Sequence, residues 1–146
     1  MKKVTWLLCF VFVLSMVSMA FASEDHDIKW GADVSEFKNL TLSHEADGIK
    51  YYAVSGETVC EISNVAVAKI TYAFKGDKLY ARIIDIDNAP DFEKVHNHFM
   101  KTFGKATAKQ EGNWEIRKWT DGDVKIKLKD NKKENKVKFG MYYQKL

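Results

Sequence analysis

The chain contains few of the residues that cross-link or hinge a small protein. Its 146 residues include two cysteines, Cys9 and Cys60, and one proline, Pro90. Because Cys9 lies in an N-terminal run that we expect to be removed, the mature chain keeps one cysteine and has no internal disulfide. We expect Cys60 to be buried as a small apolar residue, the alternative being a bond between chains. No Pro-, Gly- or Ser-rich stretch divides the chain, which argues against a linker between two domains.

Motifs that identify enzymes or metal proteins are also missing. There is no serine nucleophile elbow, Gly-rich phosphate loop or Cys/His set at zinc spacing. His96 and His98 are two residues apart on an expected helix, so their side chains point about 200° apart and cannot share an ion. His44 lies in a polar segment, and His26 would bind copper only if cleavage made it the third residue. We therefore predict no catalytic residue, metal or cofactor.

The N-terminus has the layout of a secretory signal peptide. Residues 1–3 are cationic, Trp6 to Val17 is apolar apart from one serine, and Ala20-Phe21-Ala22 offers a signal-peptidase site. Cleavage there leaves residues 23–146 as a single globular domain, located in a bacterial periplasm or secreted. The alternative is an uncleaved anchor, for which the apolar run is short. We expect no transmembrane segment after cleavage.

Charge is distributed unevenly along the mature chain. Residues 23–90 contain 7 Lys or Arg against 12 Asp or Glu, whereas residues 91–146 contain 14 against 8. Such asymmetry can indicate an anionic partner for the basic half. The simpler interpretation, which we prefer here, is that the two halves interleave in one sheet and neutralise each other. Nucleic acid is not expected, because the protein is exported and nearly neutral overall.

Alternating apolar residues predict a series of β-strands. The first group comprises Ile28–Trp30, Gly48–Val54, Thr58–Val65 and a hairpin formed by Ala66–Phe74 and Leu79–Ile86 around the turn 75–78. Between the first two strands, Asp33 to Leu42 predicts a turn or a short helix. The second group comprises Trp114–Trp119, Val124–Lys129 and Lys136–Tyr143. We therefore predict an antiparallel sheet.

One helix is clearly marked, over about residues 89–104. Asn88 or Ala89 caps it, Pro90 suits its first turn, and Gly104 ends it. A stripe at helical spacing predicts the face that packs on the sheet. The stripe consists of Phe92, Val95, Phe99 and Phe103.

The loop after Trp119 fixes the pairing of two predicted strands. We expect a three-residue loop, Thr120 to Gly122, with Gly122 left-handed. Ile116 then faces Ile126 and Trp114 faces Leu128, which keeps apolar residues together.

Lysines alternate along one of these strands and continue onto the next. Such a face could bind lipid headgroups, acidic glycans or an acidic protein, and it is our candidate ligand site. The preferred alternative is a solvated face whose lysines deter edge pairing. The candidate residues are Lys125, Lys127, Lys129, Lys136 and Lys138.

Short motifs across most of the mature chain resemble those of small exported bacterial domains of unknown function. The motifs are Trp30-Gly31, Tyr72-Ala73-Phe74 with Lys78-Leu79, and Phe103-Gly104-Lys105, with Ala106 where those domains usually have proline. The resemblance implies an α+β fold and transfers no catalytic residue. The layout is also loosely similar to β-lactamase-inhibitor-like periplasmic modules, by fold analogy alone.

The sequence therefore predicts one exported α+β domain with a helix packed on an antiparallel sheet. We expect a non-catalytic binding or envelope-associated module, whose partner is an envelope component or another exported protein. The alternative is a small secreted hydrolase with an unrecognised site.

Overall fold

The structure, a computed structural model, describes residues 28–56, 62 and 64–146. The predicted leader, His26, Cys60 and most of the predicted strand 58–65 lie outside the described residues.

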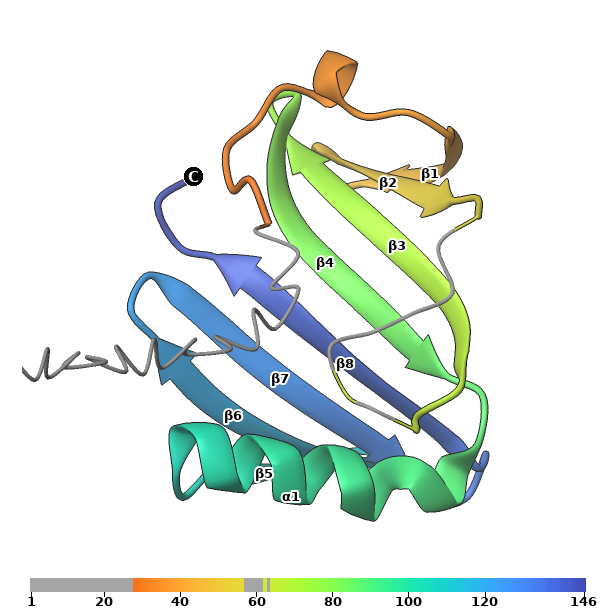
Figure 1. The fold of residues 1–146 in the computed structure, drawn as a ribbon, viewed down its shortest axis with the longest axis vertical. Helices are drawn as coiled ribbons and strands as arrows, with labels where there is room; N and C mark the ends of the chain where they lie inside the picture. The colour runs from red at the N-terminus through yellow and green to blue at the C-terminus, as the bar shows by residue number, and fades with distance from the viewer. Residues whose placement is uncertain (1–27, 57–61, 63) are drawn as a thin grey trace, which may run out of the picture.

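One antiparallel sheet of eight strands forms the body of the described chain, in the order β1-β2-β3-β4-β8-β7-β6-β5 (Figure 1). A single α-helix, α1 (Phe92–Phe103), connects β4 to β5 and lies across one face of this sheet. Two 3-10 turns, η1 (Val34–Glu36) and η2 (Ala89–Asp91), complete the regular structure of the described residues. The strands are β1 (Leu40–Ala46), β2 (Ile49–Val54), β3 (Val67–Lys75), β4 (Lys78–Ile86), β5 (Thr107–Glu111), β6 (Trp114–Asp121), β7 (Val124–Asn131) and β8 (Lys136–Tyr143).

The predicted α+β class is wrong, because strands dominate the fold. They make up 54% of the structure and helix 16%. The prediction missed β1 and β5, whose residues are almost all exposed. An edge strand with little buried surface shows no apolar alternation, which is the signal that identifies strands in a sequence. The expected opening strand Ile28–Trp30 is absent, and the possible N-terminal helix is only the three-residue turn η1.

Tight turns place the strands of the first half next to each other. β1 and β2 are joined by Asp47-Gly48, and β3 and β4 by Gly76-Asp77. All four residues have positive φ, between +54° and +73°. Two-residue hairpin loops of this kind match the twist of the flanking strands. The predicted hairpin around residues 75–78 is therefore confirmed.

The two halves of the chain lie side by side and do not interleave. Strands β1–β4 are contiguous, strands β8, β7, β6 and β5 are contiguous, and the strand pairing that joins the two halves of the sheet is β4 with β8. The basic residues of the second half therefore stay together, contrary to the expected neutralisation.

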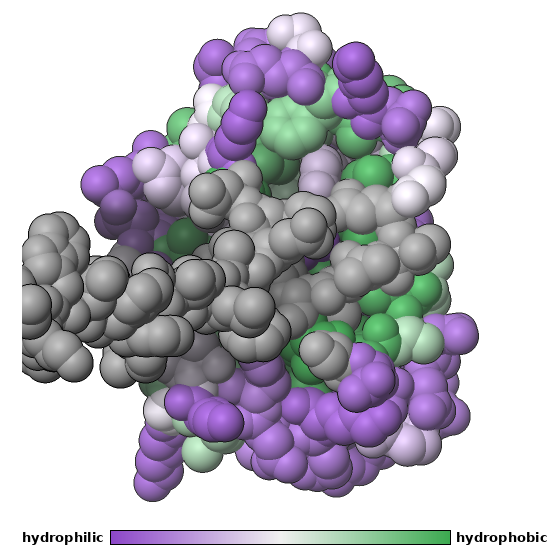
Figure 2. All heavy atoms as spheres, viewed as in Figure 1, coloured by the Kyte–Doolittle hydropathy of each residue, from purple (hydrophilic) through white to green (hydrophobic). Residues whose placement is uncertain are grey.

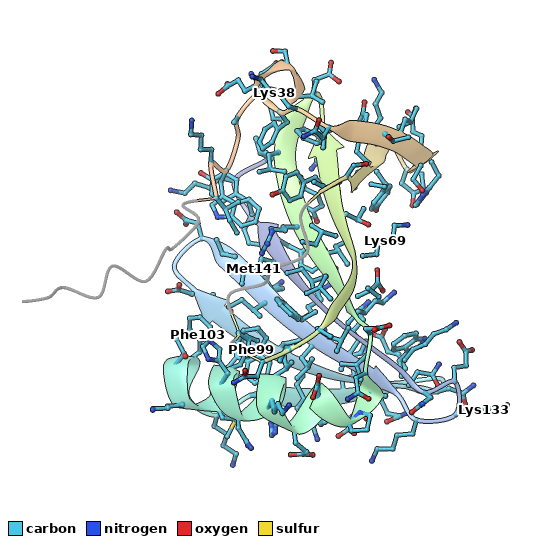
Figure 3. The ribbon with its side chains drawn as sticks, turned by 45° about the vertical axis from the view of Figure 1, so that its right-hand side comes forward. Lys38, Lys69, Phe99, Phe103, Lys133 and Met141 are labelled. Carbon is cyan, nitrogen blue, oxygen red and sulfur yellow. The ribbon has the colours of Figure 1, made fainter. Side chains whose placement is uncertain are left out.

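The predicted face of the helix is confirmed. Phe92, Val95 and Phe99 are buried, and Phe103 is half-buried against the same cluster. Figure 3 shows Phe99 and Phe103 between α1 and the sheet. Figure 2, which views the α1 side, shows hydrophobic residues gathered beside α1 and hydrophilic residues on its outer surface. Gly104 ends the helix with a φ of +83°.

The core forms where the helix meets the sheet, and β3, β4, β6, β7 and β8 all contribute buried residues to it. The ring of Phe99 lies 5.4 Å from that of Trp119 and 5.2 Å from that of Phe139, centroid to centroid. The indole N–H of Trp119 donates a hydrogen bond to the carbonyl oxygen of Gly104, at 2.9 Å. This bond fixes the end of the helix to β6.

The predicted register of β6 against β7 is wrong. The loop has two residues, Gly122 and Asp123, and it places Trp119 opposite Ile126 and Ile116 opposite Lys129. Gly122, with a φ of +54°, begins this loop. The prediction aligned Ile116 and Trp114 with the core. In the structure Trp119, only 4% exposed, lies beneath the helix, whereas Ile116, 3% exposed, is buried on the opposite side of the sheet.

Candidate functional site

Strand β7 presents different chemistry to the two sides of the sheet. Ile126 and Leu128 point toward α1 and are 2% and 0% exposed. The alternating Lys125, Lys127 and Lys129 point to the opposite face and are half-buried. The three lysines therefore share one face, as predicted.

Cross-strand pairing adds two further lysines to this group. Lys118 of β6 lies directly opposite Lys127, and Lys138 of β8 lies directly opposite Lys129. Like charges placed opposite each other in a sheet destabilise it. We call this group the lysine face. It comprises Lys118, Lys125, Lys127, Lys129 and Lys138, all half-buried.

The predicted and observed lysines differ at two positions. Lys136 is exposed at the start of β8, where its ammonium lies 2.7 Å from a carboxylate oxygen of Glu134. That ion pair raises the pKa of Lys136. Lys136 therefore lies at the border of the group with its charge already neutralised by Glu134. Lys118 was missed because its place depends on the β6–β7 register. On β3, Lys69 lies on the same side of the sheet, away from Phe99 and Phe103 (Figure 3).

The face is poorly neutralised. Among the described residues, no ion pair within 4.0 Å joins any of its five lysines to a carboxylate. Burial, followed by repulsion from neighbouring lysines of the face, lowers the pKa of Lys127. Burial and repulsion from Lys138 likewise lower the pKa of Lys129, which Glu111 partly opposes. The folded protein therefore pays a cost in stability for keeping these ammonium groups charged.

Edge protection does not explain these lysines. β6, β7 and β8 each have a neighbour on both sides, and the edges of the sheet are β1 and β5. Lysine deters aggregation at an edge strand, where backbone groups are free to pair. On interior strands that reason does not apply, so edge protection drops out of the preferred alternative and the solvated face remains.

Aromatic rings hold two of the ammonium groups. Lys127 Nζ lies 4.9 Å from the centroid of the Tyr142 ring, and Lys138 Nζ lies 4.9 Å from that of Trp114. At these distances the ring quadrupole attracts the cation. The rings fix the position of the charges without neutralising them.

Gly140 makes room for one of these rings. It lies on the lysine face, opposite Lys127, and a Cβ there would lie 2.7 Å from the Tyr142 ring. The ring therefore covers the backbone at a position where any side chain would displace it. Burial raises the pKa of Tyr142 to about 12, so this phenol stays protonated at neutral pH.

A pocket of about 240 Å³ lies at one end of the lysine face. Asp85, Trp114, Lys136, Val137 and Lys138 line it. Asp85 of β4 lies between Lys69 and Lys138 in the sheet register. The pocket therefore combines an aromatic ring, ammonium groups and one carboxylate.

His44 and His96 lie away from this pocket. His44 stacks on Tyr51 at 4.5 Å in the first half of the sheet. His96 stacks on Phe92 at 5.7 Å, beside the helix–sheet core. In the part of the chain that the structure describes, no group of three His, Cys, Asp or Glu side chains could hold a metal ion.

No helix in the described residues is long and apolar enough to cross a membrane.

Comparisons with known proteins give no family. No protein-family model matches the chain, and no curated protein matches it. Among solved structures, a cysteine-rich secretory protein from Staphylococcus aureus is similar with a TM-score of 0.42 and 12% identity. The match covers 80% of this chain and 44% of that chain, and it is too weak to support an argument.

Proposed function

We propose that this protein is an exported, non-catalytic binding module that holds a soluble polyanion on its lysine face. The observation that carries the proposal is the pair of like-charged contacts, Lys118 with Lys127 and Lys129 with Lys138, on interior strands. Such contacts oppose folding, and a bound anion would relieve the repulsion. Placing like charges opposite each other costs stability, and an unfavourable local arrangement of this kind is typical of a functional surface.

A soluble polyanion fits this surface better than a membrane does. Binding to a membrane surface combines basic residues with apolar side chains that insert between lipids. The large hydrophobic residues exposed in the described chain are Leu42 and Leu146. Leu42 belongs to β1, at the far edge of the sheet from β7, and Leu146 is the last residue. Neither lies among the five lysines.

The proposed location rests on the N-terminal sequence. Cleavage after Ala22 would release a protein that begins at Ser23 into the periplasm or the medium. Mass spectrometry of the protein from its native host should find that start. A retained Met1 would remove the basis for export.

Binding can be tested with an acidic polysaccharide, polygalacturonate, at low salt. We expect measurable association that falls steeply as salt rises, because exposed charges are screened over about 8–10 Å near physiological ionic strength. Replacing Lys125, Lys127 and Lys129 together by Gln should abolish it. Anionic vesicles, as a second arm, should bind more weakly than the polysaccharide at the same charge concentration.

The matched control removes the same charge elsewhere. Lys38, Lys105 and Lys133 are exposed and are not among the five lysines of the lysine face; Figure 3 labels Lys38 and Lys133. The variant with Gln at these three positions should keep most of the binding. Equal loss in both triple variants would mean that net charge alone drives association. Absence of binding to any polyanion by the unaltered protein would refute the proposal.

A further inference from the structure

The pocket at the end of the lysine face contains one ammonium group that is held in place and not neutralised. Lys138 Nζ lies over the Trp114 ring at 4.9 Å, and among the described residues no carboxylate lies within 4.0 Å of it. The second lysine of the pocket, Lys136, is already paired with Glu134. Lys138 is therefore the group that an anion entering the pocket would meet.

A carboxylate in the same pocket restricts which anions can bind. Asp85 is the neighbour of Lys138 across β4 and β8, and it lines the pocket. A multiply charged group such as a phosphate monoester would be attracted by Lys138 and repelled by Asp85. A ligand that carries hydroxyl groups beside a single negative charge would instead donate hydrogen bonds to Asp85.

The aromatic wall adds a third requirement. Trp114 is half-buried, and its indole forms an apolar surface next to the charged groups. The face of an aromatic ring is electron-rich, and it attracts the polarised C–H bonds that line one side of a sugar ring. Small-molecule sites commonly join such an apolar wall to a few polar groups that fix orientation. At about 240 Å³, the open pocket suits a single small ring.

From this arrangement we propose that the pocket is a subsite for one carboxylated sugar unit of an acidic polysaccharide. The sugar carboxylate accepts hydrogen bonds from Lys138, its hydroxyl groups donate to Asp85, and its C–H face packs on Trp114. The rest of the polysaccharide then crosses the lysine face. This inference rests on the proposed function, because it assigns the class of polyanion.

The test compares two soluble probes, oligogalacturonate and inorganic tripolyphosphate, by calorimetry at equal ionic strength. The Asp85→Asn variant keeps the size of the side chain and removes its charge. It should bind oligogalacturonate at least about tenfold more weakly, the usual effect of losing a hydrogen bond to a charged group. The same variant should bind tripolyphosphate more tightly, because a repulsive carboxylate is gone. Lys138→Gln should weaken the binding of both probes.

Two controls complete the experiment. Lys125→Gln, on β7 and outside the pocket, should weaken both probes to a similar and smaller extent. Oligogalacturonate should change the fluorescence of the unaltered protein, and Trp114→Phe should remove that change while its melting temperature confirms the fold. Tighter binding of both probes by Asp85→Asn would overturn the sugar subsite and leave the proposed function standing. No binding of either probe to the unaltered protein would refute the proposed function itself.

Discussion

The two sides of β7 differ in burial and in charge. On the side that faces α1, Ile126 and Leu128 are almost completely buried. They belong to the same buried cluster as Phe99. Their alternation along the strand and their packing therefore favour the same fold. On the other side, Lys127 and Lys129 are half-buried, lie opposite other lysines and have a lowered pKa.

This difference separates the side of the sheet that stabilises the fold from the side that is proposed to bind a ligand. A sequence specifies a fold when its local and global preferences agree, and the apolar cluster around Phe99 meets that condition. The lysine face opposes it where Lys118 lies opposite Lys127 and Lys129 lies opposite Lys138. We take that cost as the signature of a binding surface. Changes in the apolar cluster under α1 should therefore reduce stability, and replacing the lysines of the lysine face should affect mainly binding.

The largest effect is expected on the α1 side. Phe99→Ala should lower the free energy of unfolding by about 3–5 kcal/mol, because it removes a buried ring and leaves a cavity. Urea denaturation would measure this loss. Lys101→Ala, on the exposed side of the same helix, should change stability by no more than about 0.5 kcal/mol. An unchanged midpoint for Phe99→Ala would contradict the packing of the helix on the sheet.

A smaller effect is expected at Gly140, where the lysine face does depend on packing. Gly140→Ala should cost about 1–3 kcal/mol, because the added Cβ displaces the Tyr142 ring. In a Tyr142→Ala background the same change should be neutral or slightly stabilising, since alanine suits a strand better than glycine. A double-mutant cycle gives this coupling. Additive effects would show that the ring does not occupy this space.

The tyrosine pKa gives an independent readout of the same contact. The Tyr142 phenol, with a pKa of about 12, should be the last tyrosine to ionise in an absorbance titration. Tyr142→Phe should remove that final step, and Gly140→Ala should move it toward the ordinary value near 10.

The smallest effect is expected for a single lysine. Lys127→Met keeps the aliphatic stem and removes the charge, so it should raise the free energy of unfolding by a few tenths to about 1 kcal/mol at pH 7, as for a relieved cross-strand repulsion. Because the pKa of Lys127 is lowered on folding, its cost is fully present at neutral pH and fades as the pH rises toward 10.5. The advantage of Lys127→Met should fade over the same range. A difference in the free energy of unfolding that does not change with pH would show that the added stability comes from packing.

Sequence reasoning predicted the parts of the fold that local chemistry determines. The stripe of Phe92, Val95 and Phe99 and the ending at Gly104 defined the helix, and the turn at 75–78 defined a hairpin. The balance of strand and helix was wrong because the edge strands β1 and β5 bury too little surface to show a pattern.

The composition of the site depended on pairings that no local signal gives. Alternation alone placed Lys125, Lys127 and Lys129 on one face. Adding Lys118 required the register set by the Gly122-Asp123 loop, and the correct loop length could not be chosen without knowing that Trp119 lies under α1. The pocket required the pairing of β4 with β8, which are far apart in the sequence.

The most direct test of the central claim is a single thermal-unfolding comparison. The unaltered protein and the double variant Lys127→Met/Lys129→Met are each unfolded with and without saturating polygalacturonate. A ligand that binds only the folded state raises the melting temperature. We predict that the double variant is at least as stable as the unaltered protein without ligand, and that the ligand raises the melting temperature of the unaltered protein alone. A less stable double variant together with equal ligand shifts in both proteins would contradict the claim that the lysine face sacrifices stability for binding.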